Sequence, residues 1–371
     1  MNFSIKRDIF LNGIQKTLGI VERKTTLPIL NNILIKTELE QIRIVATDRE
    51  IGLISHYAAK IITHGEITVA ARKLFEMVRE IEGDVIDFKV MENNRVTVTC
   101  GKMIYKIPGI SADDFPEVMD VENVEPIKMQ CSVLKNIIDK TFFAISNDEM
   151  RPNLNGIFFK VIDGKVDVVA TDGHRLSIVS VLLESVSDDN IGIKGVIIPR
   201  KGVSEIRKLV DDGDYIDVCV MDSVYVVRKK NTTLRISLID AEYPDYKRVI
   251  PEKGGVELQL DKNKILHSLR RMSVMSTEKF SGVKIEVYNQ RIVLTSTNPD
   301  VGEAKDEIDV SYNGDPLEAG YNVRYLIDAM EAIDENIVSF EVRGDEGPGV
   351  IRAADNKDYM CIVMPVKLRK D

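Results

Sequence analysis

Apolar residues return at helical spacing in three separate stretches of the chain. Within each stretch most of them stand three or four positions apart, so they fall on one face of a helix. The three apolar sets are Ile9, Phe10, Ile14 and Leu18; Leu134, Ile137, Ile138 and Phe142; and Ile265, Leu266, Leu269 and Met272. Three amphipathic helices are therefore predicted.

Strands and a second helix follow each of these stretches. Residues 156–161 and 166–170 are rich in β-formers and alternate in polarity, which predicts two strands after the second helical stretch. A further helix is predicted near residues 73–80, 200–209 and 323–333, and strands at 225–227 and 234–237 close the second copy. This repeated order of elements indicates an α+β fold.

Short sequence motifs recur at the same period as these elements. Leu30-Asn31-Asn32-Ile33 returns as Leu154-Asn155-Gly156-Ile157, and Ala46-Thr47-Asp48 returns as Ala170-Thr171-Asp172, both 124 residues later. A weaker third copy, Phe280-Ser281-Gly282-Val283 with Ser296-Thr297-Asn298, follows at an offset of 126. Equal spacings between separate motifs indicate a threefold internal repeat. Gene duplication in some other α+β protein remains an alternative.

The repeat predicts three domains, at residues 1–124, 126–252 and 254–371. The boundaries fall at Pro126 and near Glu252-Lys253-Gly254-Gly255, which are polar and typical of turns. A chain of 371 residues, 44% of them hydrophobic, is long enough to bury a core in each domain.

Composition narrows the possible classes of protein. Apolar runs are short and the N-terminus carries no signal peptide, so we expect a cytosolic protein. The cysteines Cys100, Cys131, Cys219 and Cys361 form no C-x-x-C pair, which favours reduced core thiols over zinc or disulfides. No nucleotide-binding or hydrolase motif is present, and we expect no cofactor and no metal.

The net charge of −9 is unevenly distributed along the chain. Six helix windows, at residues 6–20, 72–80, 131–145, 200–209, 262–273 and 323–333, together carry +10, which leaves −19 for the rest. Basic helices within an acidic protein suit a surface that meets phosphates. Without a recognition-helix motif, the expected contact is with the nucleic-acid backbone and independent of base sequence. Ordinary solvated helix faces could also produce such an excess.

Thr171-Asp172 follows a predicted strand and continues as Gly173-His174-Arg175-Leu176. Its simplest interpretation is a turn in which Asp172 binds nearby backbone N–H groups. An alternative is a hydrolase that uses Asp172 and His174 as its polar pair, although no Ser or Cys nucleophile motif accompanies them.

Ala170-Thr171-Asp172-Gly173-His174-Arg175-Leu176 resembles the signature of the bacterial β sliding clamps, the beta subunits of replicative DNA polymerase. Four further segments resemble that family in the family's order, from the first domain to the last residues: Thr26-Leu27-Pro28-Ile29-Leu30, Asp114-Phe115-Pro116, Tyr243-Pro244-Asp245-Tyr246 with Arg248-Val249, and Met364-Pro365-Val366-Lys367-Leu368. The resemblance therefore covers the whole chain.

The resemblance implies three DNA-clamp domains per chain and a head-to-tail homodimeric ring, with sheets outside and helices lining the hole. Such a processivity factor encircles duplex DNA and tethers the replicative polymerase and other clamp-binding proteins without catalysis. A clamp-loader ATPase opens the ring, and the protein works in the bacterial cytoplasm at the nucleoid. A DNA-binding repeat protein that never closes remains an alternative.

The resemblance also implies three sets of site residues. A dimer contact would join Val274 and Met275 to Tyr105, although Tyr105 could instead be buried in its own domain. DNA-facing positions are Lys24, Arg200 and Lys201 by resemblance, and Arg7, Arg270 and Arg271 by the charge argument alone. The expected peptide-binding pocket comprises Leu154, Thr171, Gly173, His174, Arg175, Leu176, Pro244, Arg248, Val249, Ile362, Val363, Met364, Pro365, Val366 and Leu368.

The end of the chain supports this pocket on physical grounds. Ile362-Val363-Met364 can finish a strand, and Pro365, which lacks an N–H, stops the pairing. Val366 and Leu368 are then apolar groups on a terminus that could line a cleft for Leu or Phe anchors. The alternative is a final strand tucked into its own core. Lys367, the extension Arg369-Lys370-Asp371, and Arg151-Pro152-Asn153 depart from the family's usual pattern.

Overall fold

A computed structural model describes residues 1–21, 27–118, 126–162, 164–183, 195–211, 213–221, 223–252, 254–277, 279–344, 347–356 and 358–367. The chain divides into two compact units. The first unit contains residues 1–132 and 204–238, and the second contains residues 133–203 and 239–371.

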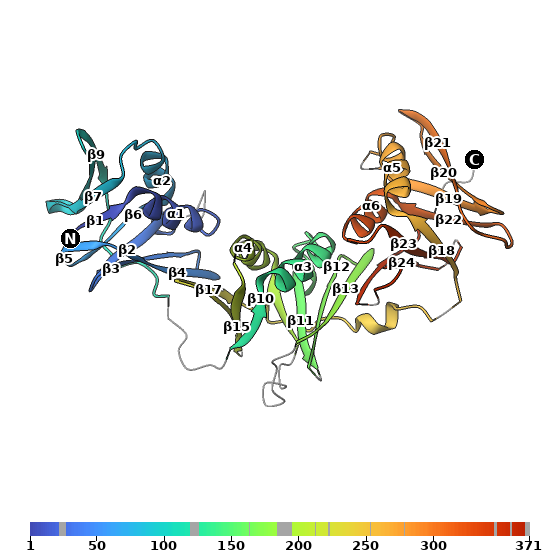
Figure 1. The fold of residues 1–371 in the computed structure, drawn as a ribbon, viewed down its shortest axis with the longest axis horizontal. Helices are drawn as coiled ribbons and strands as arrows, with labels where there is room; N and C mark the ends of the chain where they lie inside the picture. Colours follow the sequence, from blue (N-terminus) through green and yellow to red (C-terminus); the bar gives the residue numbers. More distant parts are fainter. Residues whose placement is uncertain are drawn as a thin grey trace. The chain divides into compact units, whose positions relative to one another are not determined.

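The first unit contains two antiparallel sheets (Figure 1). Five strands form one of them in the order β5 (Lys60–Thr63), β1 (Asn2–Lys6), β7 (Val85–Val90), β8 (Arg95–Cys100) and β9 (Met103–Pro108). Eight strands form the other: β10 (Ile127–Gln130), β15 (Tyr215–Met221), β16 (Val224–Lys229), β17 (Thr232–Ser237), β4 (Ile51–Ala58), β3 (Gln41–Thr47), β2 (Asn32–Glu38) and β6 (Glu66–Ala70).

Helices α1 (Arg7–Thr17) and α2 (Ala71–Arg79) pack against each other in this unit. The α2 helix buries Ala71, Leu74 and Val78, which stand three and four positions apart on one face. Phe10 of α1 meets Phe3 and Phe88 edge-on with ring centroids 6.1 Å apart, while Phe3 and Phe88 stack at 4.9 Å. Burying these rings fastens the helix to the sheet.

The second unit also contains two antiparallel sheets. Eight strands form the order β14 (Val196–Pro199), β11 (Gly156–Ile162), β12 (Lys165–Thr171), β13 (Arg175–Leu182), β25 (Tyr359–Val363), β24 (Gly349–Ala353), β23 (Ile337–Val342) and β18 (Val256–Asp261). Four strands form the other sheet: β21 (Gly302–Asp309), β20 (Arg291–Asn298), β19 (Gly282–Tyr288) and β22 (Leu317–Asn322).

Helices α5 (Lys262–Ser273) and α6 (Val323–Glu331) lie side by side in this unit (Figure 1). Each begins at a side-chain cap: Asp261 accepts the N–H of Lys264, and Asn322 accepts the N–H of Arg324. Two other helices, α3 (Cys131–Thr141) and α4 (Arg200–Val210), begin in one unit and end in the other.

The structure confirms the predicted element pattern. The three amphipathic stretches coincide with α1, α3 and α5, and the second helices coincide with α2, α4 and α6. The predicted strands at 156–161 and 166–170 are β11 and β12, while 225–227 and 234–237 lie in β16 and β17. Residues 119–125 and 253 lie outside the described residues, so the two domain boundaries stay predictions. Over the described part of the chain, every helix is too short or too polar to cross a membrane.

Candidate peptide-binding cleft

The turn between β12 and β13 is held by its own side chains. Asp172 accepts the backbone N–H groups of His174 at 2.9 Å and Arg175 at 3.0 Å. The Thr171 hydroxyl accepts the N–H of Gly173 and donates to the carbonyl of Arg175 at 2.6 Å. Gly173 has φ +88°, a left-handed conformation that glycine adopts without strain. The predicted turn is therefore confirmed.

The first repeat builds the same turn after β3. Asp48 accepts the N–H groups of Glu50 and Ile51, at 3.0 and 2.6 Å, and the Thr47 hydroxyl accepts the N–H of Arg49. A pair of residues that serves as a turn in both repeats has a structural role. The hydrolase alternative gains no support here. The bond between His174 and Asp172 comes from the His174 backbone N–H and not from its ring, which stacks beside the ring of Tyr325 with centroids 6.4 Å apart.

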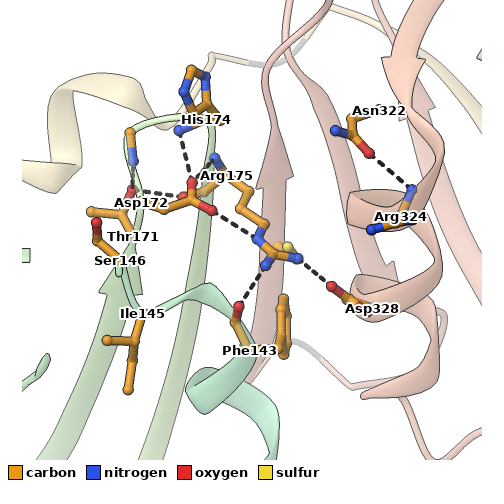
Figure 2. Close-up of polar contacts among 12 residues, drawn as sticks. Phe143, Ile145, Ser146, Thr171, Asp172, His174, Arg175, Asn322, Arg324 and Asp328 are labelled. Carbon is orange, nitrogen blue, oxygen red and sulfur yellow. Dashed lines mark hydrogen bonds and ion pairs between the residues drawn. The ribbon is translucent and has the colours of Figure 1, made fainter. Parts of the chain in front are cut away.

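Arg175 links this turn to two other elements (Figure 2). Its guanidinium donates to Asp172 at 3.1 Å, to Asp328 of α6 at 2.5 Å and to the carbonyl of Phe143 at 2.6 Å. The group also lies over the rings of Phe143 and Tyr325, 5.2 and 4.4 Å from their centroids. Only 10% of its side chain is exposed. Such a charge is tolerated out of water because its N–H groups find acceptors.

A cleft of about 280 Å³ lies beside this turn in the second unit. Its base is apolar: Leu154, Leu176 and Ile362 are 6%, 3% and 1% exposed and belong to one core cluster. Its rim includes Val249 and Met364, which are exposed. The complete lining is Leu154, Thr171, Gly173, Arg175, Leu176, Pro244, Asp245, Tyr246, Val249, Ile362 and Met364.

An aromatic pair supports the base of the cleft from below. Phe158 and Tyr243 stack with centroids 4.6 Å apart, and the Tyr243 hydroxyl donates to the carbonyl of Val169 at 3.4 Å. Burial raises the pKa of Tyr243, so this hydroxyl stays protonated and remains a donor. These rings hold the segment 243–249 against β11 and β12.

The C-terminal segment forms the opposite wall of the cleft. Strand β25 ends at Val363, and the N–H of Met364 then donates to the carbonyl of His174 at 2.9 Å. Pro365 forms an isolated bridge with Tyr321, and the N–H of Val366 donates to Gly320 at 2.9 Å. The predicted strand end is met only in part, because β25 ends at Val363, before Met364, and Pro365 still bridges to Tyr321. Beyond Pro365 the chain continues onto the edge of β22.

The cleft brings together nine of the residues predicted for the pocket. They are Leu154, Thr171, Gly173, Arg175, Leu176, Pro244, Val249, Ile362 and Met364. The sequence prediction missed Asp245 and Tyr246, although both lie within the motif that begins at Tyr243.

The other six predicted pocket residues do not line the cleft. Arg248 points to solvent and pairs with Asp245 at 2.9 Å. Val363 is fully buried, while His174, Pro365 and Val366 contribute backbone contacts beside the cleft. Leu368 lies outside the described residues.

The predicted DNA-facing residues differ in their environment. Arg7 donates to the carbonyls of Val78 and Arg79 at the end of α2. The guanidinium of Arg200 lies 4.5 Å from the centroid of Phe142 and donates to Ile145, and burial lowers its pKa. Lys201 is partly buried, and Lys24 lies outside the described residues. Arg7 and Arg200 were predicted to face DNA, but both guanidinium groups bind backbone carbonyls within the chain.

Arg270 and Arg271 lie in the last turn of α5 and are more exposed. Arg270 pairs with Glu331 at 2.6 Å, and Arg271 pairs with Asp306. Their side chains are 52% and 60% exposed. Pairs this exposed contribute little stability and can exchange partners readily.

The predicted dimer-contact residues lie at the surface. Val274, just after α5, is 71% exposed, and Met275 beside it is partly buried. Tyr105 is partly exposed on β9, the outer strand of its sheet. The alternative in which Tyr105 is fully buried in its own domain does not hold.

A second cavity, of about 330 Å³, lies in the first unit and was not predicted. Its lining mixes Phe115 and Val118 with Arg43 and the ion pair of Lys36 and Glu66, whose atoms are 3.2 Å apart. Its apolar residues Phe115 and Val118 also belong to one core cluster, but four charged residues, Lys36, Arg43, Glu66 and Glu117, line it beside them. Within the described ranges, no cluster of His, Cys, Asp or Glu could hold a metal ion.

Comparisons with known proteins agree along the whole chain. The family models for the DNA polymerase III beta subunit match in order: the N-terminal domain at residues 1–120, the central domain at 128–245 and the C-terminal domain at 247–367. The beta sliding clamp of Pseudomonas aeruginosa is 33% identical over 99% of this chain and 100% of its own length. That of Vibrio cholerae is 30% identical over 99% of this chain and 100% of its own.

Solved structures show the same similarity in three dimensions. A sliding clamp from Bacillus subtilis superimposes with a TM-score of 0.95 at 25% identity, covering 100% of both chains. One from Bartonella birtlesii, bound to griselimycin, has a TM-score of 0.94 at 31% identity and covers 99% of this chain and 100% of its own. The chain therefore belongs to the family of bacterial DNA polymerase III beta subunits, the beta sliding clamps.

Proposed function

We propose that two copies of this chain close head to tail around duplex DNA and that the cleft of the second unit docks short peptides from replication proteins. Family membership makes the chain a sliding clamp, a non-catalytic accessory subunit of DNA polymerase. The proposal adds how the chain assembles and where its clients bind. Its expected location is the bacterial cytoplasm, at the nucleoid.

The strand pairing supports a closed dimer, and this is the observation that carries the proposal. Within the chain, β17 pairs with β4, and β25 pairs with β13. The corresponding strands of the remaining repeats are β9 and β21, which are the outer strands of their sheets. Pairing β9 of one copy with β21 of another repeats the same junction between chains, and two such junctions close a ring.

Side chains at the two outer strands are complementary. The β9 strand carries Lys106 and the exposed Ile104, while β21 carries four acidic residues and Lys305, a net charge of −3. Opposite charges facing one another across a strand pair are stabilising, and they select the heterologous β9–β21 pair over two copies of the same edge. The exposed Val274 supplies an apolar contact nearby.

The DNA contact is proposed to be weak and independent of sequence. Arg270 and Arg271 are exposed on α5, and the helix windows carry a net +10 against −19 for the rest of the chain. Enclosure by a ring holds the protein on DNA, so contacts with phosphates need only orient the duplex. Affinity for short linear DNA should fall steeply with salt because it depends on counterion release.

The cleft has the properties of a peptide site. It combines a buried apolar base, an adaptable Met364 at the rim and backbone groups from the turn and the C-terminal segment. A Caulobacter crescentus clamp structure is described with polyethylene glycol at a putative beta-motif tethering region, and clamps from two species are described bound to griselimycin. We propose that peptides with Leu or Phe anchors occupy this cleft.

Retention on DNA of different topology tests the ring. The protein is loaded by a bacterial clamp-loader ATPase onto nicked circular DNA, isolated by gel filtration, and the DNA is then cut once. A closed ring stays on the circle and is lost after linearisation. Equal retention on both forms would favour a DNA-binding repeat protein that never closes. Retention on circles of one base sequence but not of another would contradict the sequence-independent contact.

A further inference from the structure

We propose that Asp328, on helix α6, is a positioning residue for the peptide cleft and acts through Arg175. This inference rests on the proposed function of the cleft as a peptide site. Asp328 does not line the cleft, whereas Arg175 does. Their contact therefore connects α6 to a surface that α6 itself does not form.

The contact is direct and sheltered. Nη1 of Arg175 and Oδ2 of Asp328 are 2.5 Å apart, and the two side chains are 10% and 37% exposed (Figure 2). Residues 175 and 328 come from different repeats. They come together because β13 pairs with β25, and β25 in turn packs on α6, where the Tyr359 hydroxyl donates to the carbonyl of Ala329.

Asp328 is one of three acceptors that together fix the orientation of the guanidinium plane. A guanidinium is planar, and its N–H groups diverge in fixed directions. Asp172 holds Nε, the Phe143 carbonyl holds Nη2, and Asp328 holds Nη1. Tyr325, three residues before Asp328 on α6, lies under the same plane at 4.4 Å. Without Asp328, Nη1 loses its carboxylate acceptor in a largely enclosed place. Because an unpaired buried donor costs free energy, the guanidinium is then expected to rotate toward another acceptor.

Rotation of the Arg175 guanidinium would disturb both walls of the cleft through Asp172. Nε of Arg175 bonds Oδ2 of Asp172 at 3.1 Å, and Oδ1 of the same carboxylate accepts the N–H groups of His174 and Arg175 that hold the turn. Met364 in the C-terminal wall donates its N–H to the carbonyl of His174 and lines the rim. One arginine thus joins the turn wall to the C-terminal wall. A cleft held in its binding geometry loses less entropy when a peptide binds.

Substitution of Asp328 by asparagine tests the proposal. Asp328→Asn keeps the shape of the side chain and removes its charge. Calorimetry with a short synthetic peptide from a bacterial replicative polymerase, carrying Leu and Phe anchors, should show roughly 2- to 30-fold weaker binding, the range expected for residues that act at one remove from a ligand. Melting temperature and sedimentation of the dimer verify that the variant is folded.

Glu331→Gln is the matched control. Glu331 is on the same helix, three residues further, and its carboxylate also pairs with an arginine, Arg270, at 2.6 Å. Its substitution removes the same charge from α6 without touching Arg175, so peptide affinity should stay unchanged. Equal weakening by both substitutions would mean that the general charge of α6 matters, and would overturn the proposal.

A double-mutant cycle separates positioning from general destabilisation. Arg175→Lys replaces the guanidinium, with its diverging N–H donors, by a single ammonium group. In that background Asp328→Asn should have little further effect on peptide affinity. Full additivity of the two substitutions would contradict an action through Arg175. If Asp328→Asn folds poorly, Asp328→Glu, which keeps the charge but shifts the carboxylate, should give an intermediate affinity. Absence of peptide binding by the unsubstituted protein would instead refute the proposed function of the cleft, and this inference with it.

Discussion

Burial protects the four cysteines to different degrees. Cys131, Cys219 and Cys361 are buried, whereas Cys100 is partly exposed. Burial raises the pKa of the Cys361 thiol to about 12 and also raises the pKa of Cys219. Since the thiolate is the reacting species, a raised pKa and a closed environment both suppress reaction at neutral pH.

We therefore expect one fast-reacting thiol in the folded protein. A thiol reagent at pH 8 should modify Cys100 first, and the other three cysteines should react only when the protein unfolds. Peptide mass mapping of a labelling time course identifies the sites. Cys100→Ser should remove the fast phase, and early labelling of Cys361 would contradict the burial of β25.

Glu341 is an acidic group whose ionised form is stabilised in the fold. Burial opposes ionisation, but the Gly255 N–H at 3.0 Å and the guanidinium groups of Arg343 and Arg352 outweigh it and lower the pKa of Glu341. A carboxyl whose pKa is lower in the folded state than in the unfolded state stabilises the fold above its ordinary pKa of about 4.3. That stabilisation is lost as the pH falls through the folded value.

Glu341→Gln should accordingly reduce the free energy of unfolding by about 1.5–3 kcal/mol at pH 7, the usual contribution of hydrogen bonds to a charged group. The difference from the unsubstituted protein should shrink as the pH is lowered from 7 toward 3, because protonation of the carboxyl in the folded state removes the stabilisation. Urea unfolding at the two pH values measures it. Glu318→Gln is the control, because its pair with Lys284 is more exposed and should change the free energy by less than about 1 kcal/mol. If the difference in the free energy of unfolding were the same at both pH values, ionisation of Glu341 would not be its cause.

The C-terminal segment is a wall of the cleft rather than a free tail. Met364 and Val366 each donate a backbone N–H to a different strand or turn, and Ile362 forms part of the apolar base. The predicted alternative, in which the final strand only completes its own core, describes β25 but not residues 364–367.

Deletion of residues 364–371 should abolish binding of the polymerase-derived peptide and leave the dimer intact. The truncation removes Met364 from the rim and the backbone contacts with His174 and Gly320, while β25 stays complete. Calorimetry measures the affinity, and sedimentation measures the mass. Unchanged affinity in the truncated protein would place the peptide site elsewhere.

The proposed dimer includes an apolar contact at a residue that a single chain leaves exposed. Val274 follows α5 and is 71% exposed. Val274→Arg would place an unpaired charge in the proposed contact with the second copy, where it would be removed from water without a partner. We expect monomers at concentrations at which the unsubstituted protein is a dimer, and loss of retention on circular DNA.

Leu182→Arg is the matched control for this prediction. Leu182 is also 71% exposed, but it ends β13 and lies on neither proposed edge strand. Sedimentation velocity should show a dimer for Leu182→Arg and a monomer for Val274→Arg. Dimers of both variants would remove Val274 from the interface.

Local patterns along the chain were sufficient to predict its elements and its repeat. Helical and strand periodicity depend on neighbouring residues, so α1 to α6, β11 and β12 could be located from spacing alone. The turn at Asp172 was equally predictable, because its bonds join residues two or three apart. The family followed from motifs whose order along the chain is itself part of the sequence.

The partners of charged side chains could not be read from the sequence. Arg175 meets Asp328 across 153 positions, and Arg7 and Arg200 bind backbone carbonyls rather than standing free. Charge counting treats every arginine alike, whereas packing decides which of them reach a carboxylate, an aromatic ring or solvent. The sequence by itself determined the elements, the threefold repeat and most of the cleft's lining. Only the tertiary structure decided which residues join the cleft to α6, because such contacts depend on how separate repeats pack together.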